Sequence, residues 1–381
     1  MNDFYDVIVA GLGAMGSLTT YQLARRGHRV LGLDRFTPPH AMGSSHGFSR
    51  IIREAYFEDP RYVPLVQQAY EEWATLEARS NVRVFRQTGG LMLGPPDGVL
   101  VSGALRSAEL HGLPHELLSA REVAARFPAF APDAAMVGVV EPRAGILSPE
   151  LAIGAALDVA RTDGATIHVG ESLLSWHEVP GGVEVVTTGG RYRAGSLLIS
   201  VGAWTRDVVE ELALPLVVQR NVQHWFTPLR SPQHFAAEHL PIFIGEYAPG
   251  KAWYGFPDVG DGLKVALHHH GEVVHPDTVN RDVAPDEVES VREILARYMP
   301  DANGTWRHSA VCMYTNAPDE HFVIGRHPWC ARVVVASPCS GHGFKFASVL
   351  GDVLADLTTD CPPAYDLSLF ALDRDALRVG S

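Results

Sequence analysis

A glycine-rich turn near the N-terminus constrains the fold of this chain more than any other feature. It reads Gly11-Leu12-Gly13-Ala14-Met15-Gly16 and follows Phe4–Ala10, an apolar, β-branched run typical of a buried parallel strand. In a GxGxxG turn the first glycine permits the tight bend, the second lets the backbone approach a pyrophosphate, and the third lets helix and strand pack closely. The pattern therefore predicts a dinucleotide-binding βαβ unit.

The next residues complete this unit. A helix is expected over Ser17–Arg26, and a second buried strand over Arg29–Leu33. Asp34 ends that strand, where an acidic side chain accepts hydrogen bonds from an adenosine ribose. The motif alone does not separate FAD from NAD, and a glycine-rich turn of a flavodoxin-like sheet is the plainer alternative. A motif at the very start, with the domain completed by later segments, favours FAD.

The rest of the chain predicts an α/β protein with two interleaved domains. We expect a discontinuous, Rossmann-like FAD-binding domain and an inserted α+β substrate domain built on a mainly antiparallel sheet. Further helices are expected at Arg61–Ala78, Ala104–His111, Ala120–Arg126, Pro149–Asp163, Asp286–Tyr298 and Phe344–Leu357. Further strands are expected at Gly90–Leu93, Arg193–Val201, Val222–Thr227, Leu263–His268 and Val333–Ala336. Residues 1–81, 142–215 and 318–381 are assigned to the FAD-binding domain, and 82–141 and 216–317 to the substrate domain.

Composition excludes several classes of protein. The formal net charge of -13 argues against a nucleic-acid binder, which needs clustered lysine and arginine. We expect no signal peptide, and no stretch approaches the roughly 20 apolar residues of a membrane span. The four cysteines form no CxxC pair, so reduced thiols in a cytoplasmic protein are expected.

Several polar side chains in the sequence are candidates for a site. Arg50 and Arg53 would share a face on a helical turn, and their guanidinium forks suit a carboxylate; two solvated arginines at a helix start are the alternative. Lys264 lies in a strand-like apolar run, where an inward lysine needs a partner or a task, although a solvent-facing lysine is as plausible. Cys312 alone reads as a buried structural thiol.

Two further segments near a predicted strand and helix carry polar residues. The adjacent residues His268, His269 and His270 would point to opposite faces of a strand, so they cannot all ligate one ion and no metal is expected. Ser340–Phe346 is a second glycine-rich turn before a helix, whose N–H groups could hold an anion or polarise a carbonyl. Lys345 stands in the first helical turn, where the macrodipole disfavours a cation, which favours function over stability.

Taken together, the motifs resemble one known family. They are GLGAMGS near the start, SSHGFSRIIREAY at 44–56, GAW at 202–204, YGFP at 254–257, AVCMYTNAPDEHFVIG at 310–325 and SGHGFKF at 340–346. The chain resembles the monomeric sarcosine oxidase and N-methyltryptophan oxidase family of FAD-dependent amine oxidases over essentially its whole length. The resemblance implies oxidation of a secondary amine, such as an N-methyl amino acid, to an imine that hydrolyses, with oxygen reduced to hydrogen peroxide.

The resemblance also implies roles for individual residues. Cys312 would carry FAD as an 8α-S-cysteinyl flavin, Arg53 and Lys345 would grip the substrate carboxylate, and Lys264 would activate oxygen. Arg50, Ser49 and His46 would line the opposite flavin face, while His268, Tyr254 and Tyr314 would surround the substrate amine. The full set expected to bind FAD is Gly11, Gly13, Ala14, Met15, Gly16, Asp34, Arg35, Ser44, Ser45, His46, Ser49, Arg50, Gly202, Trp204, Cys312, Met313, Gly341, His342, Gly343, Phe344 and Lys345. The expected partners are an amino-acid substrate and oxygen, and the expected state is a monomer.

Some segments depart from the family pattern and leave the substrate open. Pro338 and Cys339 replace the small and aromatic residues that are common there, and Phe48 and Gln223–Trp225 also differ. A bulkier N-methyl, cyclic or glycated amino acid is therefore compatible with the sequence. Two other functions stay open: a dehydrogenase with non-covalent FAD that passes electrons to a quinone or carrier, and a catalytically idle flavin-binding module.

Overall fold

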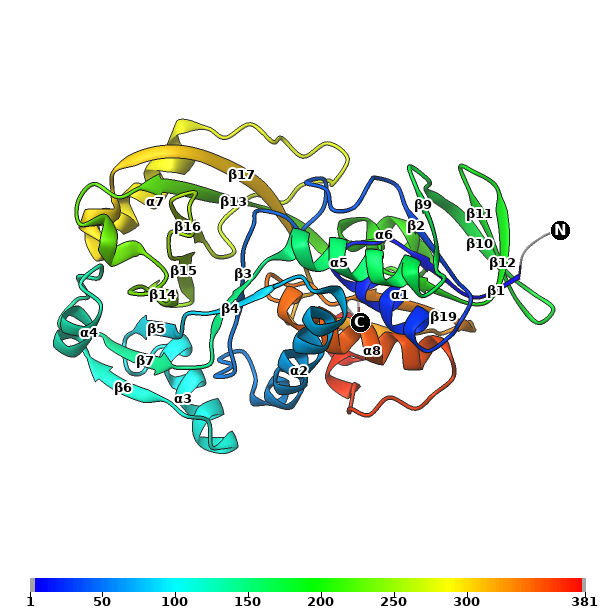
Figure 1. The fold of residues 1–381 in the computed structure, drawn as a ribbon, viewed down its shortest axis with the longest axis horizontal. Helices are drawn as coiled ribbons and strands as arrows, with labels where there is room; N and C mark the ends of the chain where they lie inside the picture. Colours follow the sequence, from blue (N-terminus) through cyan, green and yellow to red (C-terminus); the bar gives the residue numbers. More distant parts are fainter. Residues whose placement is uncertain (1–3, 379–381) are drawn as a thin grey trace.

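Two eight-stranded sheets organise the computed structural model, which describes residues 4–378 (Figure 1). In the first sheet, a parallel core has the order β9-β2-β1-β12-β19, and antiparallel strands extend it on the β12 and β19 sides. Its strands are β1 (Phe4–Ala10), β2 (Val30–Asp34), β9 (Thr166–Val169), β10 (Leu173–Val179), β11 (Gly182–Thr187), β12 (Arg191–Ile199), β18 (Val323–His327) and β19 (Cys330–Ser337). This is the expected Rossmann-like arrangement.

The central strand β1 is buried on both faces from Val7 to Ala10, which explains the apolar run there. Val7 and Val9 join one hydrophobic core, and Ile8 and Ala10 join another on the opposite face. The first of these cores also holds buried side chains of α1 (Ala14–Arg25), α2 (Val63–Ser80), α5 (Pro149–Thr162) and α8 (Ala347–Thr358). The helix α1, which starts at the glycine turn, therefore packs against a sheet strand that has a hydrophobic core on each face.

The second sheet has the order β17-β13-β16-β15-β14-β5-β7-β6, and every pair except β14 with β5 is antiparallel. Its strands are β5 (Gly90–Gly94), β6 (Glu116–Ser119), β7 (Val137–Glu141), β13 (Val217–Thr227), β14 (Ile242–Ala248), β15 (Lys251–Phe256), β16 (Leu263–Leu267) and β17 (Thr305–Asn316). The long strands β13 and β17 run side by side towards the first sheet (Figure 1). The mainly antiparallel substrate sheet is thus as expected.

One face of this second sheet is closed by a helix. Leu263, Val265 and Leu267 of β16 pack in one core with Val291 and Leu295 of α7 (Pro285–Tyr298). Because side chains alternate along a strand, Lys264 and Ala266 project from the other face. That face is left for the functional site.

Shorter elements connect these layers. A three-stranded sheet joins β3 (Arg50–Ile52), β8 (Gly145–Leu147) and β4 (Phe85–Gln87). The remaining helices are α3 (Val99–His111), α4 (Ala120–Arg126) and α6 (Thr205–Val208), with 3-10 turns at Pro60–Tyr62, Gly202–Trp204, Glu210–Leu212, Pro232–Phe235, Pro300–Ala302, Phe344–Phe346, Ser368–Phe370 and Asp375–Leu377. Among residues 4–378, no helix combines the length and apolar character that a membrane crossing requires.

Two local predictions need correction. Arg50 and Arg53 do not share a helical turn, because Arg50–Ile52 forms β3 and pairs with β8, as suits its two isoleucines. The closing helix is also divided: Phe344–Phe346 is a 3-10 turn, and α8 begins at Ala347. The assigned boundaries between the two domains stay a prediction.

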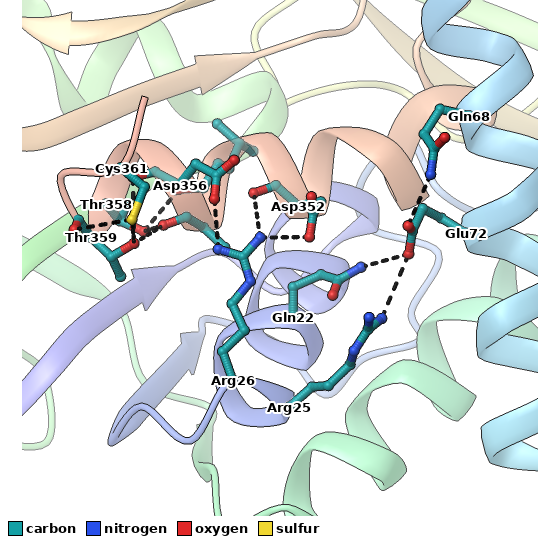
Figure 2. Close-up of polar contacts among 12 residues, drawn as sticks. Gln22, Arg25, Arg26, Gln68, Glu72, Asp352, Asp356, Thr358, Thr359 and Cys361 are labelled. Atoms are coloured by element: carbon teal, nitrogen blue, oxygen red, sulfur yellow. Dashed lines mark hydrogen bonds and ion pairs between the residues drawn. The ribbon is translucent and has the colours of Figure 1, made fainter. Parts of the chain in front are cut away.

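A polar clamp joins the first and last helices of the nucleotide-binding sheet. Arg26, which caps α1, donates hydrogen bonds to Asp352 Oδ1 at 2.5 Å and Asp356 Oδ1 at 2.7 Å on α8 (Figure 2). Beneath it the two helices are in close contact, since a Cβ on Gly351 would lie 2.9 Å from Leu18 Cβ. Neighbouring Arg25 makes a longer ion pair of 3.7 Å with Glu72 of α2.

Removing this clamp should weaken the fold measurably. We expect Arg26→Met to lower the free energy of unfolding by about 1 kcal/mol, since the pair is partly solvated and part of its Coulomb energy is screened. Arg25→Met is the matched control and should cost less, because its ion pair is longer and more exposed. Urea unfolding followed by circular dichroism measures both, and equal losses would contradict a specific clamp.

Candidate active site

A cavity of about 530 Å³ extends from the glycine turn to the second sheet. It is lined by most of the predicted site residues: Gly11, Gly13, Ala14, Met15, Asp34, Arg35, Ser44, Ser45, Arg50, Arg53, Gly202, Trp204, Tyr254, His268, Cys312, Met313, Tyr314, Gly341, His342, Gly343, Phe344 and Lys345. Four predicted residues do not line it, namely Gly16, His46, Ser49 and Lys264. Residues as far apart in the sequence as Gly11 and Lys345 thus line the same cavity.

At one end the glycine turn has the shape that a pyrophosphate needs. Gly11 has a φ of +88°, and a Cβ there would lie 2.6 Å from the Ser200 carbonyl oxygen. A Cβ on Gly13 would meet only Ser45 Oγ, at 3.9 Å, so this part of the turn is open to the cavity. The backbone N–H groups at the start of α1 are therefore accessible to an anion.

Asp34 stabilises this turn by accepting backbone hydrogen bonds. Its Oδ2 accepts a hydrogen bond from the Leu12 N–H at 2.7 Å, and its Oδ1 accepts one from the Phe36 N–H at 2.7 Å. The predicted contact with a ribose stays a prediction, although Asp34 lines the cavity. The carboxylate thus has a structural task that sequence reasoning did not assign to it.

The rim beside Asp34 is held by Asp277. Arg35 Nη1 and Trp204 Nε1 both donate to Asp277 Oδ1, at 2.7 and 2.8 Å. Trp204 follows Gly202, whose φ of +59° turns the chain at the end of β12. These hydrogen bonds to Asp277 hold Arg35 and Trp204, both predicted to contact FAD, at the same edge of the cavity.

Cys312 lies in the middle of the cavity wall beside a cation. Its Sγ is 3.6 Å from Arg50 Nη2, and Arg50 is held by the carbonyl oxygens of Ser44 and Ser49, each at 2.7 Å. Sγ also contacts the Ser44 carbonyl oxygen, at 3.5 Å. Burial, followed by the charges of Arg50 and Lys264, lowers the pKa of His46 to about 3, so this imidazole is neutral.

Lys264 is buried beneath this region, on the face of β16 that α7 leaves free. Its Nζ donates to the Gly47 carbonyl oxygen at 2.7 Å and to the carbonyl and hydroxyl oxygens of Ser49, each at 3.1 Å. It also lies 5.1 Å from the ring centre of Trp225 and 4.8 Å from that of Phe256. Desolvation, and then the charge of Arg50, holds its pKa well below the usual value. The solvent-facing alternative is therefore excluded.

Two more cations meet at the other end of the cavity. Arg53 is 1% exposed, and its Nη2 lies 2.6 Å from both carboxylate oxygens of Glu58. Lys345 Nζ donates to the His342 carbonyl oxygen at 2.7 Å and contacts the Tyr56 hydroxyl at 3.4 Å. Burial, and then the charge of Arg53, lowers the pKa of Lys345 to about 7. Arg53 and Lys345 thus form a positive pocket that a carboxylate can enter.

Polar ring side chains face this pocket. The Tyr254 and Tyr314 hydroxyls are 3.2 Å apart, and the Tyr314 hydroxyl is 3.4 Å from His268 Nδ1. Gly341 presses on the same group, since a Cβ there would lie 2.8 Å from Tyr314 Cε2 and 2.9 Å from His268 Cε1. Burial lowers the pKa of His268 well below 6.5 and raises the pKa of both phenols, so all three are uncharged near neutral pH.

Residues 6–357 match the family model described as FAD dependent oxidoreductase. The chain belongs to this family. A monomeric sarcosine oxidase from Streptomyces avermitilis is 44% identical, covering 97% of both chains. An N-methyl-L-tryptophan oxidase from Salmonella agona is 35% identical, covering 97% of this chain and 99% of the relative. These matches confirm the predicted family resemblance.

The solved structures agree on the fold. An open form of NikD, an unusual amino acid oxidase essential for nikkomycin biosynthesis, superposes with a TM-score of 0.85 at 26% identity, with 97% of each chain covered. A glycine oxidase from Geobacillus kaustophilus superposes with a TM-score of 0.82 at 21% identity and supports the fold alone. The predicted fold class of this FAD-dependent oxidoreductase is therefore confirmed.

The cavity also fits FAD by its own chemistry. Ser44 and Gln223 line the cavity, and Ser44 Oγ and Gln223 Oε1 are buried with no hydrogen-bond partner within residues 4–378. Buried polar atoms are normally paired, so unpaired ones near a cavity indicate a polar ligand. Together with the open glycine turn, they match a long dinucleotide with a polar ring at its far end.

Sequence reasoning missed some residues of this oxidoreductase site. Glu58 was not predicted, although an acid five positions after Arg53 was available as a signal. Gln223, Pro338 and Cys339 line the cavity but were noted only as departures from the family pattern. Burial raises the pKa of Cys339 to about 11, so it is a neutral thiol. Within the described residues, no group of three or more histidine, cysteine, aspartate or glutamate side chains is placed to hold a metal ion.

The lowered pKa of Lys345 predicts pH-dependent carboxylate binding. Lys345 carries its positive charge below about pH 7 and loses it above, so propionate should bind up to tenfold more weakly per pH unit above that value. Lys345→Met should bind propionate weakly at every pH. Changes in flavin absorbance during titration from pH 6 to 9 measure the affinity, and a flat wild-type profile would contradict the prediction.

Proposed function

We propose that this protein oxidises the secondary amine of an N-substituted amino acid, such as an N-methyl amino acid, and reduces oxygen to hydrogen peroxide. One observation carries the proposal: the buried cations Arg53 and Lys345 lie in the same cavity as Cys312 and the glycine turn. The names of the relatives, sarcosine oxidase and N-methyl-L-tryptophan oxidase, support this substrate class. We expect the enzyme to act as a cytoplasmic monomer.

The walls of the pocket determine which form of the substrate binds. Arg53 and Lys345 hold the carboxylate through charge-assisted hydrogen bonds, with Glu58 sharing the Arg53 guanidinium. The same positive charges disfavour a protonated amine, so the neutral form with its free electron pair is favoured. His268, Tyr254 and Tyr314 are uncharged and can exchange hydrogen bonds with this amine. The chain thereby presents an oriented, electron-rich amine.

Bound FAD would supply the two-electron acceptor for loss of one hydrogen from the α or N-methyl carbon and one from the amine nitrogen, which converts the C–N bond to C=N. The oxidised substrate is an imine, which water hydrolyses. Lys264 stabilises the negative charge that develops when electrons pass to oxygen, since a fixed cation in a dry site needs no reorganisation. Its hydrogen bonds to Gly47 and Ser49 hold that charge in place.

We also propose that Cys312 forms a thioether with the ring methyl group of the flavin. The bond removes one hydrogen from the thiol and one from the methyl group, and the two released electrons leave by way of the ring to oxygen. Arg50, at 3.6 Å from Sγ, supports this step because a fixed positive charge stabilises the negative charge on an attacking sulfur. Stoichiometric hydrogen peroxide in air would separate this oxidase from a dehydrogenase that feeds a quinone.

Removing the thiol tests the covalent bond. Wild-type protein should keep yellow, fluorescent flavin on its band after denaturing electrophoresis, whereas Cys312→Ala should carry none there. Cys330→Ala is the matched control, since Cys330 is buried on β19 and does not line the cavity. Flavin that stays on the Cys312→Ala band would refute the assignment.

Replacing Lys264 tests the oxygen half-reaction. In Lys264→Met, reduction of the flavin by substrate without oxygen should change little, but reoxidation by oxygen should slow at least 100-fold, the range seen when a preorganised electrostatic group is lost. Lys251→Met, on the exposed part of β15, is the control and should leave both rates unchanged. Stopped-flow absorbance measures the two rates separately. Equal damage to both half-reactions would argue against the role.

A further inference from the structure

Gln223 lies on β13, the second strand of the sheet that carries Lys264 and Cys312. It lies between Ala310 of β17 and Ala266 of β16, and Ala266 in turn pairs with Tyr254 of β15. Alanine on both sides leaves the longer side chain of Gln223 free to project from the sheet. Gln223 lines the cavity, although it is only 1% exposed.

The amide oxygen of Gln223 is buried without a donor. Oε1 has no hydrogen-bond partner within residues 4–378, and it lies close to Gly47, because a Cβ there would clash with Oε1. A buried carbonyl that stays unpaired destabilises the protein. A side chain of this kind at a cavity wall indicates a ligand that donates a hydrogen bond.

The neighbours of Gln223 show which ligand reaches it. Asn221, two residues earlier on β13, pairs with Cys312, and Trp225, two residues later, pairs with Lys264. Gln223 therefore stands between the thiol and the buried ammonium group, on the same face of the sheet. A cofactor ring held at Cys312, as proposed above, would lie over this position if it also extended towards Lys264.

Gln219 offers an internal comparison. It is on the same strand and face, but its Nε2 donates to the Gly271 carbonyl oxygen at 2.8 Å, and its Oε1 accepts from Asn316 Nδ2 at 3.2 Å. It does not line the cavity. Gln223 thus differs from Gln219 in two respects, since it lines the cavity and its amide oxygen has no hydrogen-bond partner within residues 4–378.

We propose that Gln223 is a cofactor-contacting residue whose amide oxygen accepts a hydrogen bond from the isoalloxazine ring of FAD. The proposal rests on the placement of the ring beside Cys312 in the proposed function. The ring gains an N–H group when it takes two electrons, and an acceptor facing that group stabilises the reduced form. Gln223 thereby makes the flavin easier to reduce.

The test is the reduction potential of the flavin in Gln223→Leu, measured by equilibration with a reference dye. We expect the equilibrium for reduction to be about tenfold less favourable than in wild type, which is about 30 mV for a two-electron couple. Gln219→Leu should lower thermal stability but leave the potential unchanged. A Gln223→Leu potential that is equal to or higher than the wild-type value would overturn the proposal.

A measurement on the wild type keeps the test decisive if the variant does not load with flavin. In protein labelled with ¹³C-glutamine, the infrared difference spectrum between oxidised and reduced states should show a glutamine carbonyl band that shifts to lower frequency on reduction. Gln219→Leu should retain this band, since it keeps Gln223. Absence of any shifting glutamine band would overturn the proposal.

The outcome is independent of the covalent bond. Denaturing electrophoresis of the same samples reports whether flavin is attached to Cys312, whereas the potential and the infrared band report the contact with Gln223. Attached flavin with an unchanged potential would reject the Gln223 contact alone. Unattached flavin with a lowered potential would reject the thioether and support the contact.

Discussion

Positive charge inside an acidic protein is the constraint on which the site depends. The chain carries a formal net charge of -13, yet Arg53, Lys264 and Lys345 are each no more than 4% exposed around one cavity, and half-buried Arg50 joins them. Burying a cation costs several kcal/mol unless hydrogen bonds and an opposite charge offset it. Glu58 is the carboxylate that pairs directly with Arg53. Backbone carbonyl oxygens accept hydrogen bonds from Lys264, Lys345 and Arg50. An anionic cofactor, an amino-acid carboxylate or reduced oxygen would neutralise the positive charge that stays without a carboxylate partner.

The sheet architecture makes this arrangement possible. One face of β16 is sealed by α7, so the cavity face can carry Lys264 without exposing the core. The register then aligns side chains that are distant in sequence, such as Gln223 and Tyr254 on either side of Ala266. The glycine turn at Gly341 closes the opposite wall by pressing on Tyr314 and His268. The strand register and the turn at Gly341, more than the residue types alone, bring these side chains together in a single site.

The sequence predicted those features whose cause is local. The GxGxxG turn, the strand before it and Asp34 follow from backbone requirements that are visible within about 30 residues. The helical turn expected for Arg50 and Arg53 was wrong, because pairing with β8 is a long-range contact that spacing does not reveal. The pairing of Arg53 with Glu58 is local, five residues apart, and could therefore have been predicted from the sequence. The unpaired state of Gln223 Oε1 could not be predicted, since it depends on the register of three strands and on the approach of Gly47.

The central position of β1 has a consequence for how the protein is made. β1 emerges first from the ribosome, but its neighbour β12 is at Arg191–Ile199, and β19, which pairs with β12, is at Cys330–Ser337. The Ser200 backbone that abuts Gly11, and α8 that covers α1, likewise arrive late. The nucleotide-binding turn therefore lacks several of its packing partners until β12, β19 and α8 have also been translated. Removal of any of these later segments would disturb the N-terminal motif even though the motif itself is intact.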